Sequence, residues 1–314
     1  MADWERALDK QLATYLWWHT PVAEQVAEGW AEDVNSKYTR SETARGIVRQ
    51  QRQLLWQADP IWITEDMADL LEAAWPQFEP ELVRQDDLII PAGFALLPRV
   101  LYVTDLWGKR TPVRAIAWMQ AADDEGPGIF VTLYCGATDA DDYGTEKLPF
   151  MSRLYGDAMS MSHTTALRFG TDPAQLAKNA YEARTDKDRI SEEQAWQASF
   201  QQLRLLQCFW RLTKQQIAVG FRRQPSRATR RRSERAEYPD KYVTVVTLRR
   251  PRSDSAEPEH HAVDWKMRWI VSGHWRWQPY KDGSRRQIWI APYVKGPEDK
   301  PLAVRKLRVF QWSR

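Results

Sequence analysis

The first quarter of the chain places its apolar residues at helical spacing. Leu8, Leu12 and Leu16 recur every fourth residue, and similar spacing continues to about residue 75. Ser41 is expected to cap a helix that runs to about residue 58, and Thr64 is expected to cap the next one. This pattern predicts a helical region over residues 1–75.

Short apolar runs replace the helical spacing between residues 88 and 136. Proline and glycine interrupt these runs, and the clearest interruption is the turn cluster Asp-Asp-Glu-Gly-Pro-Gly at 123–128. We expect a small antiparallel sheet over 88–136, packed against the N-terminal helices.

The strongest helical pattern in the chain begins at a capping box, Ser191-Glu-Glu-Gln194. A wide apolar stripe follows and predicts one helix over about 192–219. After it come a basic segment and four strand-like stretches, at 241–249, 262–271, 286–293 and 303–312. The second of these alternates apolar and basic residues, as a strand with one buried face does.

The predicted fold class is therefore α+β, with two lobes. The N-terminal lobe, 1–187, is helical and carries the small antiparallel sheet. The C-terminal lobe, 188–314, is the long helix, a basic linker and a four-stranded antiparallel sheet. The charged stretch 186–189 is the expected boundary.

Composition narrows the class of protein. The chain has 314 residues, of which 43% are hydrophobic and 28% charged, which is typical of a globular protein. Cys135 and Cys208 have no metal-ligand spacing around them, and no nucleotide-binding, zinc-protease or hydrolase motif is present, so no cofactor and no metal site is predicted. The N-terminus does not resemble a signal peptide, and no apolar run is long enough to span a membrane. We expect a cytoplasmic protein that does not bind a membrane.

The net charge of +3 hides an uneven distribution. One segment of fourteen residues contains a single acid, Glu234, and seven arginines, which are Arg222, Arg223, Arg227, Arg230, Arg231, Arg232 and Arg235. The guanidinium groups of such a cluster repel one another unless water or anions surround them. The planar guanidinium group also has the geometry to bind phosphate with two hydrogen bonds. The preferred interpretation is phosphate binding in a nucleic acid. A solvated linker or exposed helix end, and a site for an acidic protein partner, are the alternatives.

A second segment, Gly273–Lys295, combines proton-transfer, cationic and aromatic groups. His274 is a candidate acid or base, and the other candidate catalytic residues are Arg276, Tyr280, Arg285 and Lys295. The residues expected to meet nucleobases are Trp275, Trp277 and Gln278. The alternative is a structural hairpin, and the 17 tryptophans of the chain serve cores as readily as stacking.

These features lead to two hypotheses of different classes. The first is a protein that binds RNA or single strands, because arginines and aromatics are plentiful and no helix-turn-helix pattern is evident. Its stronger form is a metal-independent ribonuclease, since the order of one helix and four strands is similar to that of small microbial ribonucleases. The second is a structural or interaction adaptor that docks an acidic protein through its Trp-rich sheet.

Three groups of segments together resemble a family of uncharacterised proteins from actinobacterial genomes and mobile elements. They are 91–94 with 107–118, 227–232 with 243–251, and 269–276 with 288–297. The resemblance spans most of residues 88–314. It implies a cytoplasmic compartment and that type of source, and it implies no activity.

Overall fold

The computed structural model describes residues 3–31, 39–104, 110–123, 126–136, 157–172, 175, 178, 191–249, 269–271 and 273–295. The chain divides into two compact units, Met1–Arg249 and Arg250–Arg314. The predicted boundary at 186–189 lies outside the described residues.

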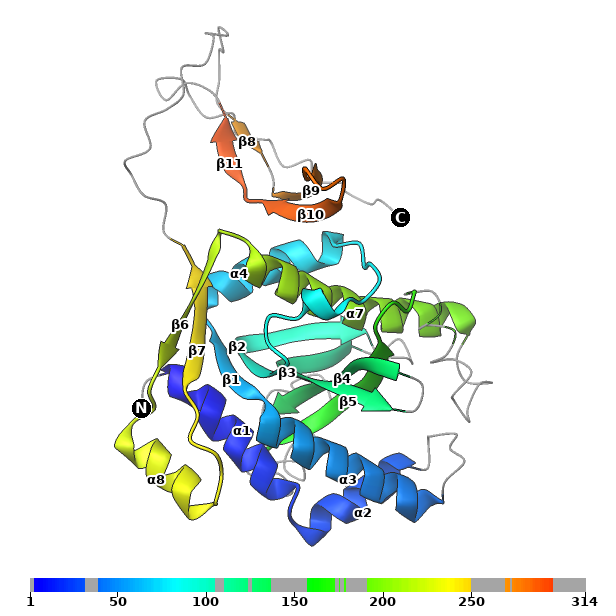
Figure 1. Ribbon diagram of the computed structural model, residues 1–314, viewed down its shortest axis with the longest axis vertical. Coiled ribbons are helices and arrows are strands. Elements are labelled where there is room, and N and C mark those ends of the chain that lie inside the picture. The colour runs from blue at the N-terminus through cyan, green and yellow to red at the C-terminus, as the bar shows by residue number, and fades with distance from the viewer. Residues whose placement is uncertain are drawn as a thin grey trace, which may run out of the picture. The chain divides into compact units, whose positions relative to one another are not determined.

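A seven-stranded mixed sheet forms the centre of the first unit (Figure 1). Its strand order is β5-β4-β3-β2-β1-β7-β6. β1 runs parallel to both of its neighbours, β2 and β7, and the remaining pairs are antiparallel. The strands are β1 (Asp59–Ile63), β2 (Ala92–Thr104), β3 (Arg110–Asp123), β4 (Gly126–Gly136), β5 (Met159–Arg168), β6 (Ala218–Arg223) and β7 (Val243–Leu248).

Helices cover both faces of this sheet (Figure 1). One layer contains α1 (Arg6–Trp17), α2 (Pro21–Ala31) and α3 (Arg40–Gln57), and the other contains α4 (Glu65–Ala74) and α7 (Glu192–Lys214). Because both faces are buried, the central strands are nearly continuous apolar runs. Phe94 and Leu96 of β2 belong to the core beneath α1 and α3, while Gly93 and Ala95 alternate with them and point to the other layer.

The predicted C-terminal sheet is wrong. The stretch predicted at 241–249 contains β7, but β7 lies between β1 and β6 in the large sheet rather than in a four-stranded antiparallel sheet. The helix predicted from 192 does begin at Glu192, yet it ends at Lys214 and packs on β2 and β6. The small sheet expected at 88–136 is likewise one part of the same seven-stranded sheet. Pairing between strands far apart in the chain explains these differences, because local patterns do not encode it.

Gly93 gives Trp118 the space to lie across the sheet. The two residues are paired on β2 and β3, and a Cβ on Gly93 would come within 3.0 Å of the indole ring. Trp118 is fully buried, packs edge-on against Phe209 and Trp210 of α7, and donates its Nε1–H to the Ile90 carbonyl at 3.0 Å. The indole therefore links the sheet to α7 in a fixed orientation.

Three buried side chains satisfy the carbonyl groups at the C-terminal end of α3. The Lys241 ammonium donates to the carbonyls of Trp56 at 2.6 Å and Ala58 at 2.5 Å. The Gln11 amide donates to Leu55 and Ala58 at 2.8 and 2.7 Å, and the Tyr238 hydroxyl also donates to Leu55. A cation at this end complements both the free carbonyls and the helix dipole.

The described part of the second unit is a hairpin in two ladders. β8 (Trp269–Val271) pairs with β11 (Tyr293–Lys295), and β9 (His274–Pro279) pairs with β10 (Arg285–Ile290). Pairs such as 271 with 293 and 274 with 290 have the same sum of residue numbers, 564, so one antiparallel register runs through both ladders. The predicted strand at 303–312 lies outside the described residues.

Candidate functional site

The arginine segment forms the end of an edge strand and a short helix. Arg222 and Arg223 end β6, and α8 (Arg227–Arg235) follows Ser226, whose side chain accepts from the Thr229 N–H. Arginine is a good helix former, and neither glycine nor proline interrupts residues 227–235. The local sequence therefore favours a helix even though its cations repel one another.

Acidic residues near the N-terminus of the chain anchor α8 to α1. The buried Glu5 carboxylate accepts from the Ser226 N–H at 2.7 Å, the Ser226 hydroxyl at 3.2 Å and the Thr229 hydroxyl at 3.4 Å. It thus places a negative charge at the positive end of the helix dipole. One turn further on, Asp9 pairs with Arg232 at 2.5 Å.

Removing the Glu5 carboxylate should loosen α8. We expect Glu5→Ala to lower the free energy of unfolding by about 1.5 kcal/mol, because hydrogen bonds to a charged group contribute about that much. Trypsin cuts after arginine, so the rate of cleavage within α8 measures how accessible this helix is to the protease. Limited digestion followed by mass spectrometry should show cleavage within Arg227–Arg235 several-fold faster than in wild type. Asp3→Ala, at an exposed position two residues away, serves as the control, and equal digestion of the two variants would argue against the anchor.

Most of the seven arginines face solvent. Arg230 is half-buried and the other six are exposed. Arg227, Arg231 and Arg235 recur every fourth residue and form one row along α8. Within the described part of the chain, Arg232 alone among the seven is ion-paired to a carboxylate. The guanidinium groups of the row are therefore available to an external anion.

Arg222 and Arg223 belong to β6 rather than to α8. They pair with Thr244 and Val243 of β7, and as neighbours on a strand they point to opposite faces of the sheet. The Arg223 guanidinium lies 4.9 Å from the centre of the exposed Phe221 ring. The strand thus adds one cation to each side of this sheet edge.

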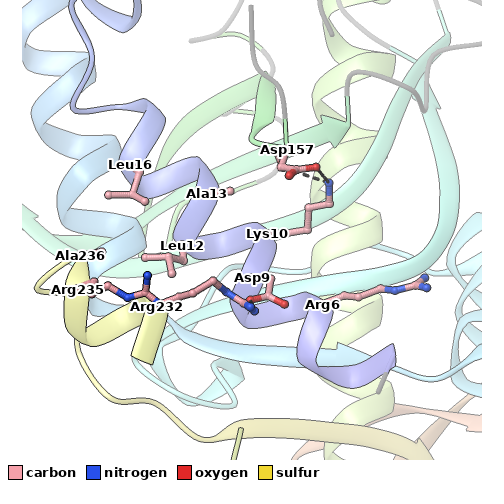
Figure 2. A pocket seen from close by; sticks show the side chains of 10 residues that line it. All are labelled: Arg6, Asp9, Lys10, Leu12, Ala13, Leu16, Asp157, Arg232, Arg235 and Ala236. Atoms are coloured by element: carbon pink, nitrogen blue, oxygen red, sulfur yellow. Dashed lines mark hydrogen bonds and ion pairs between the residues drawn. The ribbon is translucent and has the colours of Figure 1, made fainter. Parts of the chain in front are cut away.

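A cleft of about 830 Å³ is lined by residues of α1 and α8 and by Asp157 and Ala236 (Figure 2). Four apolar side chains line part of it, and its charged lining consists of four cations and two acids. The apolar residues are Leu12, Ala13, Leu16 and Ala236, and the charged ones are Arg6, Lys10, Arg232, Arg235, Asp9 and Asp157.

Ion pairs hold three of the four cations of this cleft, and one of the pairs joins Arg6 to Asp3 at 3.1 Å. Asp9 pairs with Arg232, and Asp157 pairs with Lys10 at 4.0 Å. The Lys10 ammonium also donates to the Asp157 carbonyl at 3.1 Å. Arg235 differs, because among the described residues it has no ion pair to a carboxylate and its Nε–H donates to the Arg231 carbonyl at 3.2 Å.

Strand alternation separates the candidate residues of the hairpin. His274, Arg276 and Gln278 share one face of β9, where the Arg276 guanidinium donates to the Gln278 amide oxygen at 2.6 Å. Arg285 pairs with Pro279 and lies on the other face, with Trp275 and Trp277. The structure therefore brings His274 and Arg276 to one face and leaves Arg285 off it.

Two further candidates lie at the ends of the hairpin. Tyr280 follows β9 in the turn, with the Arg286 guanidinium 5.6 Å from its ring centre. Lys295 ends β11 in the other ladder, where it pairs with Trp269. The five candidate catalytic residues are thus distributed over two faces, a turn and a second ladder.

Half of the tryptophans whose burial is described are buried. Trp18, Trp118 and Trp210 are among the largest fully buried side chains. In the hairpin, Trp289 is buried and Trp275 packs against it, with ring centres 5.5 Å apart. Trp277 is 45% exposed and is the hairpin indole best placed to contact a partner, among those whose burial is described.

Within the described residues, no group of three or more His, Cys, Asp or Glu side chains is placed to hold a metal ion. The helices described in the structure also lack any segment long and apolar enough to cross a membrane.

No family model matches the chain, and the comparison with curated proteins finds no match.

The site residues predicted from the sequence do not include those on the α1 side of the cleft. Arg6 and Lys10 are four residues apart on α1, a spacing that places both on one face of a helix. That signal is present in the sequence. The sequence contains no indication that this face lies opposite the arginine helix.

Proposed function

We propose that this chain is a cytoplasmic protein that binds single-stranded RNA through the arginines of α8 and β6. The main support for this proposal is the row of Arg227, Arg231 and Arg235. These side chains are exposed and are not ion-paired to any described carboxylate. Three guanidinium groups, one helical turn apart, extend over about 12 Å along the helix. A line of cations of that length can contact successive phosphates of one strand.

The hairpin supports a single strand over a duplex. Trp277, Tyr280 and Tyr293 are each close to half exposed, and cations lie near them in the sequence. Exposed aromatic rings stack on unpaired bases, which a duplex does not offer. The ribonuclease form of the hypothesis remains a prediction, and the distribution of its five candidate residues does not favour it.

The test is salt-dependent binding of a labelled twelve-nucleotide RNA, measured by fluorescence anisotropy. With three phosphates contacted, log K should fall with log[salt] at a slope of about −2, so affinity drops roughly 20-fold between 50 and 200 mM salt. Arg227→Glu/Arg231→Glu should weaken binding at least tenfold and flatten that slope, since two of the three contacts are lost.

Arg45→Glu/Arg49→Glu is the matched control. These two arginines are also exposed and four residues apart, on α3, and should leave affinity within about twofold of wild type. Equal loss in both double variants would mean that only net charge matters and would contradict a site on α8. If polyglutamate of equal charge competes as well as unlabelled RNA, the acidic-protein adaptor is the better explanation.

A further inference from the structure

The α1–α8 cleft adjoins the row of arginines. Arg235 ends the row and also lines the cleft (Figure 2). A strand whose phosphates follow Arg227, Arg231 and Arg235 therefore reaches the cleft at its last contact.

The apolar part of the cleft suits a flat ring better than a phosphate. Leu12, Ala13, Leu16 and Ala236 supply carbon surface, and Leu16 is 44% exposed although it is a leucine. A phosphate placed against this surface would lose water without gaining donors. A nucleobase would instead cover the exposed leucine while its phosphate stays with Arg235.

The acids of the cleft limit which base fits. The Asp157 side chain is 97% exposed beside Lys10, and an ionised carboxylate can only accept hydrogen bonds. Asp9 has one oxygen on Arg232 and a second oxygen, Oδ2, that is buried without a hydrogen-bond partner among the described residues. An exposed acceptor at the cleft attracts the exocyclic amino group of a base such as cytosine and repels the carbonyl oxygen that uracil carries at the same position.

The geometry points to a base-selective subsite: the α1–α8 cleft holds one nucleobase of the bound strand, and Asp157 selects bases that carry an exocyclic amino group. This inference rests on the proposed RNA binding and adds its base preference. The arginine row supplies affinity for any sequence, and the cleft supplies the discrimination.

Oligocytidine and oligouridine of twelve nucleotides are the probes, because the two pyrimidines differ chiefly in an amino group against a carbonyl oxygen. Wild type should bind oligocytidine about tenfold more tightly at equal salt. Asp157→Asn should reduce that ratio to about one, because an amide offers both a donor and an acceptor. The position is exposed, so the substitution should leave folding intact.

A second variant tests the apolar part of the cleft. Leu16→Ala should weaken oligocytidine binding about threefold, in proportion to the carbon surface that the base loses. Leu82→Ala is the matched control, since Leu82 is 39% exposed and does not line the cleft. Equal effects of the two variants would overturn the contact between base and Leu16.

The outcomes separate this inference from the proposed function. If both oligonucleotides bind equally and Arg227→Glu/Arg231→Glu still abolishes binding, the base subsite is wrong and the phosphate site stands. If Asp157→Asn keeps the preference for cytidine, the role of Asp157 is wrong. If neither oligonucleotide binds to wild type, both proposals fail.

Discussion

Gly93→Ala should lower the free energy of unfolding by about 3 kcal/mol, at the upper end of the usual cost of overpacking a core. The added methyl group would meet the Trp118 ring within 3.0 Å. Trp118 cannot move aside easily, because Phe209 and Trp210 pack against its ring and its Nε1–H is bonded to Ile90. Urea denaturation followed by circular dichroism measures the change.

The same substitution elsewhere provides the control. Gly46 lies inside α3, and a Cβ added there would meet nothing within 4 Å. Gly46→Ala should raise stability by about 0.5 to 1 kcal/mol, because alanine loses less conformational entropy in a helix. If Gly93→Ala lowers the free energy of unfolding while Gly46→Ala raises it, crowding at Trp118 is identified as the cause. If both substitutions raise the free energy of unfolding, the Trp118 indole has room to move.

Lys241→Met should lower stability by about 3 kcal/mol at pH 7, because it takes a buried donor away from carbonyl groups at the end of α3. The carbonyl of Trp56 then loses the donor at 2.6 Å. Methionine keeps most of the aliphatic volume, so the loss reports the missing hydrogen bonds rather than a cavity. Lys10→Met, on the surface of α1, controls for the loss of one positive charge.

The stability difference between wild type and Lys241→Met should also depend on pH. Burial lowers the pKa of Lys241 to about 8, from an ordinary value of 10.5. Between these two values the unfolded chain retains a proton that the folded protein has released, so the free energy of unfolding rises with pH. The advantage of wild type should therefore grow by about 3 kcal/mol from pH 8 to 10.5. A constant difference across that range would show that Lys241 keeps its proton.

Local signals in the sequence were accurate where short spacing determines structure. The capping box at Ser191 predicts the start of α7, which begins at Glu192. At α3 the prediction of Ser41 as the cap is wrong, because the cap is Thr39, three residues before Glu42. A capping box joins the cap to the residue three positions later, which is the spacing of Thr39 and Glu42.

The sheet could not be predicted in this way. β7 is recognisable as a strand at 241–249, but its pairing with β1 joins positions about 180 residues apart. Apolar residues alone do not specify a partner for a strand that is buried on both faces. The same holds for the candidate site. The arginine segment can be recognised in the sequence, whereas its contacts with Glu5 and Asp9 depend on the tertiary fold.

The position of β1 between β2 and β7 bears on how the protein folds as it is synthesised. Residues 59–63 leave the ribosome long before residues 243–248, so one side of β1 stays unpaired while most of the nascent chain is made. An open, apolar strand edge is a template for association with other chains. We therefore expect folding of the first unit to finish late, with β1 dependent on a chaperone or on fast elongation until β7 arrives.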